Sequence, residues 1–291
     1  LAQGAGSLRG GGVVSLPRLV YEFSEVKSIL GNREWGMTGF VRDLLGPILG
    51  DGLILSAGAQ HTALRQQLGH VQIPDLHAIV QAFDPPLGPC DLGAEMTRLA
   101  EQVIGALFGD ADRLRGAGRL VRRCIALAPF RLIGLPLDWW WVSRLNKLLC
   151  GLPSLPWMRD QQMSGKERRD WAANFVIAGV DTLAADLTAQ LAGVELLPIW
   201  WVPRRHAFTG ETVILLLSAD HKFGHGYRRC AGEYIARETA RLVLQRFEVE
   251  IVSSDLRKVG LITQRLKRVT CYLRKRAAVS TCATDSAEVR P

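Results

Sequence analysis

One cysteine lies in a glycine-rich segment whose residue types suit metal binding. Residues 223–232 read F-G-H-G-Y-R-R-C-A-G, so Cys230 follows two arginines and is followed closely by Gly232. The apolar residues after it recur with a helical period, which predicts that Cys230 lies at or near a helix N-terminus. The positive end of the helix dipole favours a thiolate there, and haem iron can take a thiolate as its axial ligand. A buried structural cysteine after a glycine turn is the other interpretation.

An acid and an alcohol stand side by side within an apolar stretch. Residues 178–182 read A-G-V-D-T, in the middle of a long helix predicted over residues 167–191. Buried polar groups are costly unless they are used or satisfied, so Asp181 and Thr182 are expected either to act in chemistry or to be satisfied in another way. Gly179 costs roughly 1 kcal/mol of helix propensity relative to alanine, and it could let the helix bend beside a bound molecule. The other interpretation is a solvent-facing Asp181 and a Thr182 hydroxyl bonded to its own helix.

A third segment, H-T-A-L-R, carries two nitrogen donors. His61 and Arg65 are four positions apart, which places both on one face of a helix predicted to begin near Ala57. Two donors on one face could bind a carboxylate, and arginine can do so with two parallel hydrogen bonds.

Together these segments resemble the cytochrome P-450 family of haem-thiolate monooxygenases. The cysteine segment matches F-x-x-G-x-R-x-C-x-G at every fixed position. The resemblance implies that haem b is the cofactor and that Cys230 is the axial ligand of its iron. The other loop residues that the resemblance assigns to cofactor binding are Phe223, Gly224, Arg228 and Gly232.

The acid–alcohol and histidine–arginine segments acquire roles from the same resemblance. The acid–alcohol pair looks like the family's oxygen-activation segment, which implies that Thr182 orients and Asp181 helps supply protons when dioxygen is activated. The histidine–arginine pair is similar to the H-x-x-x-R segment that meets the haem propionates. Several cations for two propionates are expected, because burying unpaired carboxylates is expensive. The propionate contacts that the resemblance implies are His61, Arg65, Arg228 and either Arg204 or Arg205.

The chain also departs from the family pattern. Members carry E-x-x-R on a helix before the cysteine loop, whereas the best match here is E-L-L-P, with Pro198 where arginine is expected. Only 230 − 182 = 48 positions separate Thr182 from Cys230, far fewer than is usual in the family. Scaffold between the two segments is therefore missing, while the residues that carry chemistry remain.

The periodicity predicts a mainly α protein with a small β component, a truncated cytochrome P-450-like fold. One haem-binding domain is expected over residues 1–276, with a disordered tail over 277–291. An irregular turn is expected between Pro198 and Pro203. Further helices are predicted over residues 21–30, 91–108 and 114–127, and strands over 212–217, 247–252 and 269–273.

Composition limits the choice of partners. The 291 residues carry a formal charge of +8, yet no lysine–arginine run with interleaved aromatics occurs, which disfavours nucleic acid. A basic surface that steers an acidic protein is the favoured interpretation. The six cysteines form no C-x-x-C pair and are widely spaced, which predicts reduced thiols and a cytoplasmic location. No signal peptide or membrane anchor is expected from the glycine-rich start.

The most apolar region, residues 125–142, ends in three consecutive tryptophans. It is interrupted by Arg131, Pro136 and Asp138, and it falls short of a membrane-spanning helix. Buried core is the favoured interpretation. A hydrophobic entry for substrate or a contact with a membrane surface is the alternative.

The predicted function is that of a haem-thiolate monooxygenase that hydroxylates a hydrophobic or aromatic small molecule, as in secondary metabolism. Electrons would come from NAD(P)H through a ferredoxin- or flavodoxin-type redox partner that docks near Lys222, Arg229 and Arg237. Membrane contact is not expected. The alternatives are a haem-dependent rearrangement, dehydration or peroxide-driven reaction, and a non-catalytic haem-binding relative.

Overall fold

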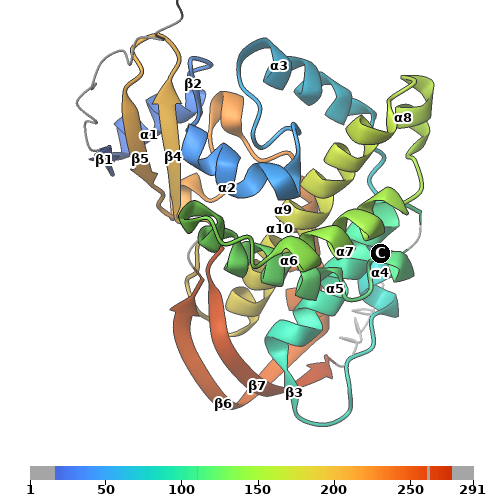
Figure 1. Cartoon of the computed structure of the whole chain (residues 1–291). Helices are drawn as coiled ribbons and strands as arrows, with labels where there is room; N and C mark the ends of the chain where they lie inside the picture. The colour runs from blue at the N-terminus through green and yellow to red at the C-terminus, as the bar shows by residue number, and fades with distance from the viewer. Residues whose placement is uncertain (1–16, 110, 261–262, 277–291) are drawn as a thin grey trace, which may run out of the picture.

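The structure is a computed structural model that describes residues 17–109, 111–260 and 263–276. The described chain is mainly helical, with two small sheets beside the helices (Figure 1), which confirms the predicted fold class. Its α-helices are α1 (Phe23–Gly31), α2 (Gly39–Leu49), α3 (Gly58–Gln67), α4 (Leu76–Ala82), α5 (Leu92–Leu107), α6 (Ala117–Leu127), α7 (Trp139–Cys150), α8 (Pro156–Asp160), α9 (Gly165–Leu191) and α10 (Glu233–Arg246). Its strands are β1 (Arg18–Val20), β2 (Trp35–Met37), β3 (Cys90–Asp91), β4 (Trp201–His206), β5 (Thr212–Leu216), β6 (Phe247–Val259) and β7 (Arg265–Lys275).

Helix α9 is the centre of the helical body. It begins at a capping box in which the Ser164 hydroxyl accepts from the Glu167 backbone N–H while the Glu167 carboxylate accepts from that of Ser164. Its 27 residues cover the predicted range, and α5, α6, α7 and α10 pack around it. By length and composition alone it could cross a membrane, but 78% of its apolar stretch is buried inside the structure. That burial is the pattern of a core helix.

The close contact between α5 and α9 explains Gly179. The predicted stripe of α5, from Leu92 to Leu107, is buried against α9. A Cβ atom at Gly179 would lie 2.7 Å from Ile104 Cδ1 on α5. The structure therefore gives Gly179 a packing role, because any larger side chain would push the two helices apart.

The larger sheet has the order β1-β5-β4-β2, with β1 parallel to β5 and the other pairs antiparallel. The irregular turn predicted between Pro198 and Pro203 is present at residues 198–200, but its predicted end is wrong, because Pro203 lies inside β4 opposite Ile214. A proline is tolerated there because β2 pairs only with residues 204–206, so no strand needs the missing N–H. This sheet and α1 share a small hydrophobic cluster that is separate from the main core.

The second sheet has the order β3-β7-β6, and its strands extend well beyond the predicted ranges. Strand β6 continues to Val259 as a largely exposed ribbon paired with β7, with two register shifts. Sequence alternation marks only the buried part of such a ribbon, so its exposed end was not predicted. The expected tail over 277–291 and Cys282 lie outside the described residues. The single domain over 1–276 stays a prediction.

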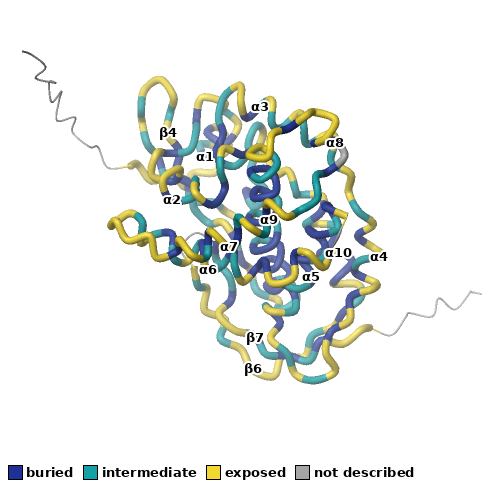
Figure 2. The backbone as a smooth tube through the Cα atoms, turned by 45° about the vertical axis from the view of Figure 1, so that its right-hand side comes forward, coloured by how far each residue is buried: buried dark blue, intermediate teal, exposed yellow. Residues whose placement is uncertain are grey.

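The interpretation of residues 125–142 as buried core is wrong for the middle of that region. Helix α6 ends at Leu127, and the chain then runs in a short 3-10 helix and a loop to Trp139. This stretch between α6 and α7 is largely exposed (Figure 2). Trp139 exposes 70% of its surface and Ile133 exposes 69%.

Candidate functional site

The cysteine loop joins the short turn at Gly226–Arg228 to helix α10. The backbone N–H of Cys230 donates to the carbonyl of Phe223 at 2.6 Å, which closes the loop. Gly224 has φ +69°, and a Cβ atom there would lie 2.3 Å from the Arg228 carbonyl oxygen. Gly232 caps α10, so the structure confirms that Cys230 lies close to a helix N-terminus.

The protonation of Cys230 differs from the expectation. Cys230 keeps an exposed surface, yet the protein packed around the sulfur raises the pKa of the thiol through desolvation. The carboxylate of Glu233 raises it further, while the Gly232 N–H and the Arg65 charge lower it. The helix N-terminus is therefore not enough to lower the pKa of this thiol. Such a thiol binds a metal by releasing its proton to solvent.

Four basic side chains from separate parts of the chain gather beside this loop. We call them the basic cluster: His61, Arg65, Arg204 and Arg228. Burial is the main reason that the pKa of His61 falls to about 3, and the nearby charges of the three arginines add to it. Burial, with a smaller contribution from the charge of Arg228, lowers the pKa of Arg204 to about 9.

Within the described residues, no carboxylate pairs with a member of the basic cluster. Arg228 donates to the carbonyls of Ser56 at 2.9 Å and Trp35 at 3.1 Å. Three buried nitrogen atoms of the basic cluster have no hydrogen-bond partner among the described residues: His61 Nδ1, Arg204 Nε and Arg228 Nε. Buried, unpaired cations are costly, so the cluster has the character of a binding site for an anionic ligand.

The structure separates the two arginines that the sequence left as alternatives. Arg204 is buried in β4, whereas its neighbour Arg205 is exposed. Successive side chains of a strand point to opposite faces, so only one of them can join the cluster. Arg205 lies against Gly210, away from the other predicted residues.

Tyr227 is a site residue that the sequence reasoning missed. Its hydroxyl donates to the Gly58 carbonyl at 2.6 Å, and its ring lies 4.3 Å from that of His61. These contacts fasten the cysteine loop to the start of α3. The position is a variable one in the cysteine motif, and only its place between Gly226 and Arg228 hinted at a role.

The acid and alcohol of α9 have different surroundings. The Thr182 hydroxyl donates to the Ala178 carbonyl of its own helix, as the alternative interpretation expected. Asp181 does not face solvent, because it is 2% exposed. Burial raises the pKa of Asp181, although Arg265, Arg122 and a Thr263 hydrogen bond oppose the rise. Arg122 Nη1 lies 3.8 Å from Asp181 Oδ1, and Asp181 Oδ2 has no partner among the described atoms.

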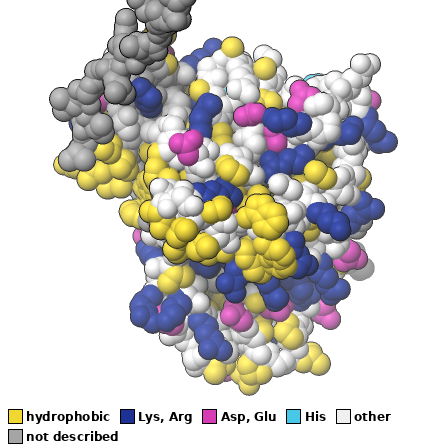
Figure 3. Space-filling model, in the orientation of Figure 1, with side chains coloured by type: hydrophobic (Ala, Val, Ile, Leu, Met, Phe, Trp, Pro, Cys, Tyr) yellow, Lys and Arg dark blue, Asp and Glu magenta, His cyan; other side chains and the backbone are white. Residues whose placement is uncertain are grey.

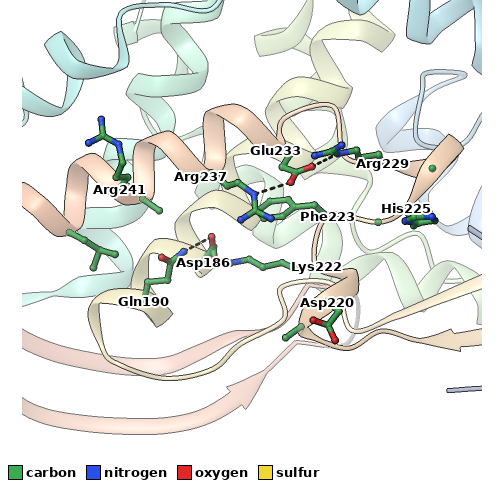
Figure 4. Close-up of a pocket in the computed structure, with 15 residues that line it drawn as sticks. Asp186, Gln190, Asp220, Lys222, Phe223, His225, Arg229, Glu233, Arg237 and Arg241 are labelled. Carbon is green, nitrogen blue, oxygen red and sulfur yellow. Dashed lines mark hydrogen bonds and ion pairs between the residues drawn. The ribbon is translucent and has the colours of Figure 1, made fainter. Parts of the chain in front are cut away.

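A cavity of ≈ 830 Å³ lies between the end of α9, the segment before the cysteine loop, and α10. The three cations expected to bind a partner, Lys222, Arg229 and Arg237, line it together (Figure 4). Arg229 and Arg237 both pair with Glu233, at 2.6 and 2.9 Å, and Lys222 pairs with Asp186. The charges are therefore gathered as predicted but are largely neutralised by their neighbours.

Comparisons with known proteins agree on the fold. No protein-family model matches the sequence, and no curated protein matches it. A six-coordinated cytochrome P450 from Thermus thermophilus has 17% identity and a TM-score of 0.70, over 88% of this chain and 92% of that one. A thermophilic cytochrome P450 from Sulfolobus tokodaii has 14% identity and a TM-score of 0.63, over 89% and 94%.

A third similar structure is the cytochrome P450 enzyme CxnD, described as acting in C–S bond formation in chuangxinmycin biosynthesis. It has 16% identity and a TM-score of 0.61, over 87% of each chain. At such identities the likeness concerns the fold, and the chain has the fold of a cytochrome P450.

Proposed function

We propose that this chain, which has a cytochrome P450 fold, is a haem-thiolate oxidoreductase in which Cys230 binds the haem iron. The observation that carries the proposal is the position of the cysteine loop beside a basic cluster that has no acid of its own. A soft sulfur ligand and partly or fully buried arginines without a carboxylate partner are together what an iron porphyrin with two carboxylates requires.

The residues present fit haem b. The unpartnered atoms His61 Nδ1, Arg204 Nε and Arg228 Nε would face the two propionates, and Arg65 lies near enough to lower the pKa of Cys230. When bound, the haem supplies the activation of dioxygen and the oxidation of the substrate. The chain supplies the sulfur ligand, the counter-charges and the path for protons.

Asp181 and Thr182 are the residues proposed to move protons. A carboxyl whose pKa is raised holds its proton to a higher pH, and Asp181 Oδ2 has no partner among the described residues that would compete for it. The Thr182 hydroxyl donates to Ala178 in this structure, so it must turn away from that carbonyl before it can orient another group. The substrate is proposed to be a hydrophobic or aromatic small molecule that is hydroxylated.

Electrons are proposed to arrive from NAD(P)H through a ferredoxin- or flavodoxin-type partner on the cysteine side. The cavity lined by Lys222, Arg229 and Arg237 supports this, because α10 leads directly from it to the cysteine loop. An acidic partner would have to compete with Glu233 and Asp186 for these cations. The electron-transfer rate should therefore fall as salt is added.

A second candidate is a haem-dependent reaction without a reductase, such as a rearrangement, a dehydration or a peroxide-driven oxidation. The Thr182 hydroxyl bonded to its own helix favours it, since such chemistry need not deliver protons to dioxygen. The segment E-L-L-P also forms no helix and supplies no arginine near the cysteine loop. Turnover with NAD(P)H and a reductase system, compared with turnover in hydrogen peroxide, separates the candidates.

The proposal is tested by an absorption spectrum of the haem-loaded protein, reduced and exposed to carbon monoxide. A thiolate-type Soret band is the expected result. A band of the kind given by a nitrogen ligand, or failure to bind haem, would contradict the proposal. A spectral shift on adding apolar compounds would then identify candidate substrates.

A further inference from the structure

An exposed run of apolar side chains follows helix α6. Figure 3 shows hydrophobic side chains gathered on the near face, in front of the stretch where Figure 1 labels α6 and α7, with Lys and Arg side chains around them. We call the run the apolar loop. Its exposed members are Phe130, Leu132, Ile133, Leu135, Leu137, Trp139 and Trp140.

The apolar loop is held in an exposed shape by buried contacts at its two ends. The Arg131 guanidinium donates to the Asp138 carboxylate at 2.9 Å and to the Leu44 carbonyl at 3.1 Å. Asp138 is fully buried, so this ion pair ties the two ends of the loop together inside the protein. The Leu135 N–H donates to the Phe130 carbonyl at 3.0 Å across a turn at Gly134. The loop is thus anchored with its apolar side chains outward.

A recess lined by arginines lies next to the apolar loop. It measures ≈ 410 Å³ and its lining is Arg119, Arg122, Arg123, Ala126 and Arg265. No acid is among the described residues that line it. Asp181 lies behind it, where Arg122 approaches it at 3.8 Å.

Two of these arginines have charges that the described part of the chain does not neutralise. Arg119 and Arg123 form no ion pair with a described carboxylate, whereas Arg122 and Arg265 lie close enough to Asp181 to lower its pKa. Arg123 instead lies 5.6 Å from the ring of Trp141, and that ring lies 4.5 Å from the ring of Trp140 in the apolar loop. The recess and the loop are therefore parts of one continuous surface.

We propose that this surface docks on an anionic lipid membrane. The apolar loop would enter the outermost acyl region, where tryptophan side chains are favoured at the boundary with water. The arginines of the recess would bind the phosphates of lipid headgroups, because the guanidinium fork matches phosphate oxygens. Stable attachment of a protein to a bilayer surface needs two such signals, one apolar and one basic.

Charge complementarity favours a membrane over other partners. A second copy of this chain docked by the same face would bring like-charged arginines together. Nucleic acid would satisfy the arginines but would leave the apolar loop in water. A bilayer with anionic lipids offers dense negative charge and an apolar interior within one surface. The expectation from composition, that no membrane contact occurs, gives way to this proposal, which does not depend on haem.

The test is sedimentation of the full chain with vesicles, in the haem-free and haem-loaded forms. We expect binding to phosphatidylcholine vesicles that contain phosphatidylserine, and much weaker binding to phosphatidylcholine alone. The variant Arg119→Gln/Arg123→Gln should weaken binding by about tenfold or more, since each cation near the surface contributes about 1 kcal/mol, a factor of about five. The variant Ile133→Ser/Trp139→Ser should also weaken it.

Matched control variants change exposed residues elsewhere in the chain. Arg257→Gln/Lys258→Gln removes two exposed cations from β6, and Leu87→Ser/Phe208→Ser removes two exposed apolar side chains. Both controls should bind as the wild type does. Equal losses in the controls, or equal binding to vesicles without phosphatidylserine, would overturn the proposal.

A soluble phosphate ion is the other ligand that could occupy the arginine recess. Inorganic phosphate should release no more protein from the vesicles than chloride does at equal ionic strength. Full release by phosphate alone would assign the recess to a small soluble ligand and would overturn the membrane proposal. Thermal melts of each variant confirm folding, because all of the substituted residues are exposed.

Discussion

The cysteine loop and the middle of α9 both carry residues predicted to do chemistry, and the chain leaves them in different states. Beside the loop, three buried nitrogen atoms have no partner and no described carboxylate neutralises the cations. In α9, the Thr182 hydroxyl donates to its own helix, while Asp181 approaches Arg122 through Oδ1 and leaves Oδ2 without a partner among the described residues. Unsatisfied buried groups indicate a ligand that arrives from outside the chain, whereas a satisfied group such as the Thr182 hydroxyl requires a rearrangement before it can act.

Removing the sulfur should have the largest effect. Cys230→Ala is expected to abolish the thiolate-type spectrum of the reduced protein with carbon monoxide, because no other described cysteine lies in the loop. Cys150→Ala is the matched control, since Cys150 is also exposed and free. The control should keep the wild-type spectrum. An unchanged spectrum in Cys230→Ala would show that Cys230 does not bind the haem iron.

Removing one buried cation should raise the stability of the haem-free protein and lower its affinity for haem. Arg204→Met is expected to stabilise the haem-free protein by on the order of 1 kcal/mol, because an unpaired charge leaves the interior. The same change should weaken haem binding by at least about tenfold, the loss of one charge-assisted hydrogen bond. Denaturant titration and haem titration measure the two effects.

Arg205→Met is the control for that experiment, because Arg205 is the exposed neighbour on the same strand. It should leave both quantities near their wild-type values. If Arg204→Met destabilised the haem-free protein, the cluster would be structural and the contrast with α9 would disappear.

The third experiment compares two threonines of α9. Thr182→Ala is expected to leave folding and haem binding intact. It should divert a large part of the electrons into peroxide or water, because protons would no longer be delivered at the right step of dioxygen activation. Thr188→Ala is the matched control, since the Thr188 hydroxyl donates to the Ala184 carbonyl at 2.7 Å in the same way. The ratio of product to NAD(P)H consumed is the measurement. Equal ratios in both variants would show that Thr182 is structural.

The smallest expected effect concerns pH. The pKa of His61 is about 3 in the folded chain and about 6.5 when unfolded, so its neutral form stabilises the native state above pH 6.5. Stability of the haem-free protein should fall as pH drops from about 6.5 towards 3, since only the unfolded chain takes up this proton. His61→Gln should flatten that slope, while His70→Gln, at an exposed position, should not.

Binding of a cofactor with two carboxylates should change this pH dependence of stability. Carboxylates beside His61 would raise its pKa in the folded protein, so the haem-loaded form should lose less stability over the same pH range. Denaturant midpoints at several pH values measure the slope. An identical slope in both forms would place the propionates away from His61.

The sequence predicted much of this site because the motifs lie on short, local structure. The helix stripe of α5, the loop before α10 and the i, i+4 pair of α3 are each set by a few neighbouring residues. The choice between Arg204 and Arg205 could not be made, because it depends on which face of β4 meets the protein interior. Arg265, in β7, lines the same recess as the arginines of α6, and no local sequence pattern predicts that they lie together.

The error at residues 125–142 has a similar physical cause. Hydropathy records how apolar a segment is, but the Arg131–Asp138 ion pair decides that its side chains point outward. Pro203 also misled, because a proline is excluded from a strand only where a neighbour needs its N–H. Long-range anchoring and sheet register were the information that the sequence lacked.

The separate hydrophobic cluster of α1 and the larger sheet has a consequence for the order in which the chain opens. Its members are Val20, Val26, Ile29, Leu30, Trp35, Val213 and Leu215. A unit with so few buried apolar residues opens at a lower free energy than the body around α9. Amide hydrogens of β4 and β5 should therefore exchange with solvent before those of α9. A ligand that binds both Arg204, in the larger sheet, and His61, in the helical body, would couple the two parts. They would then unfold together in one cooperative transition.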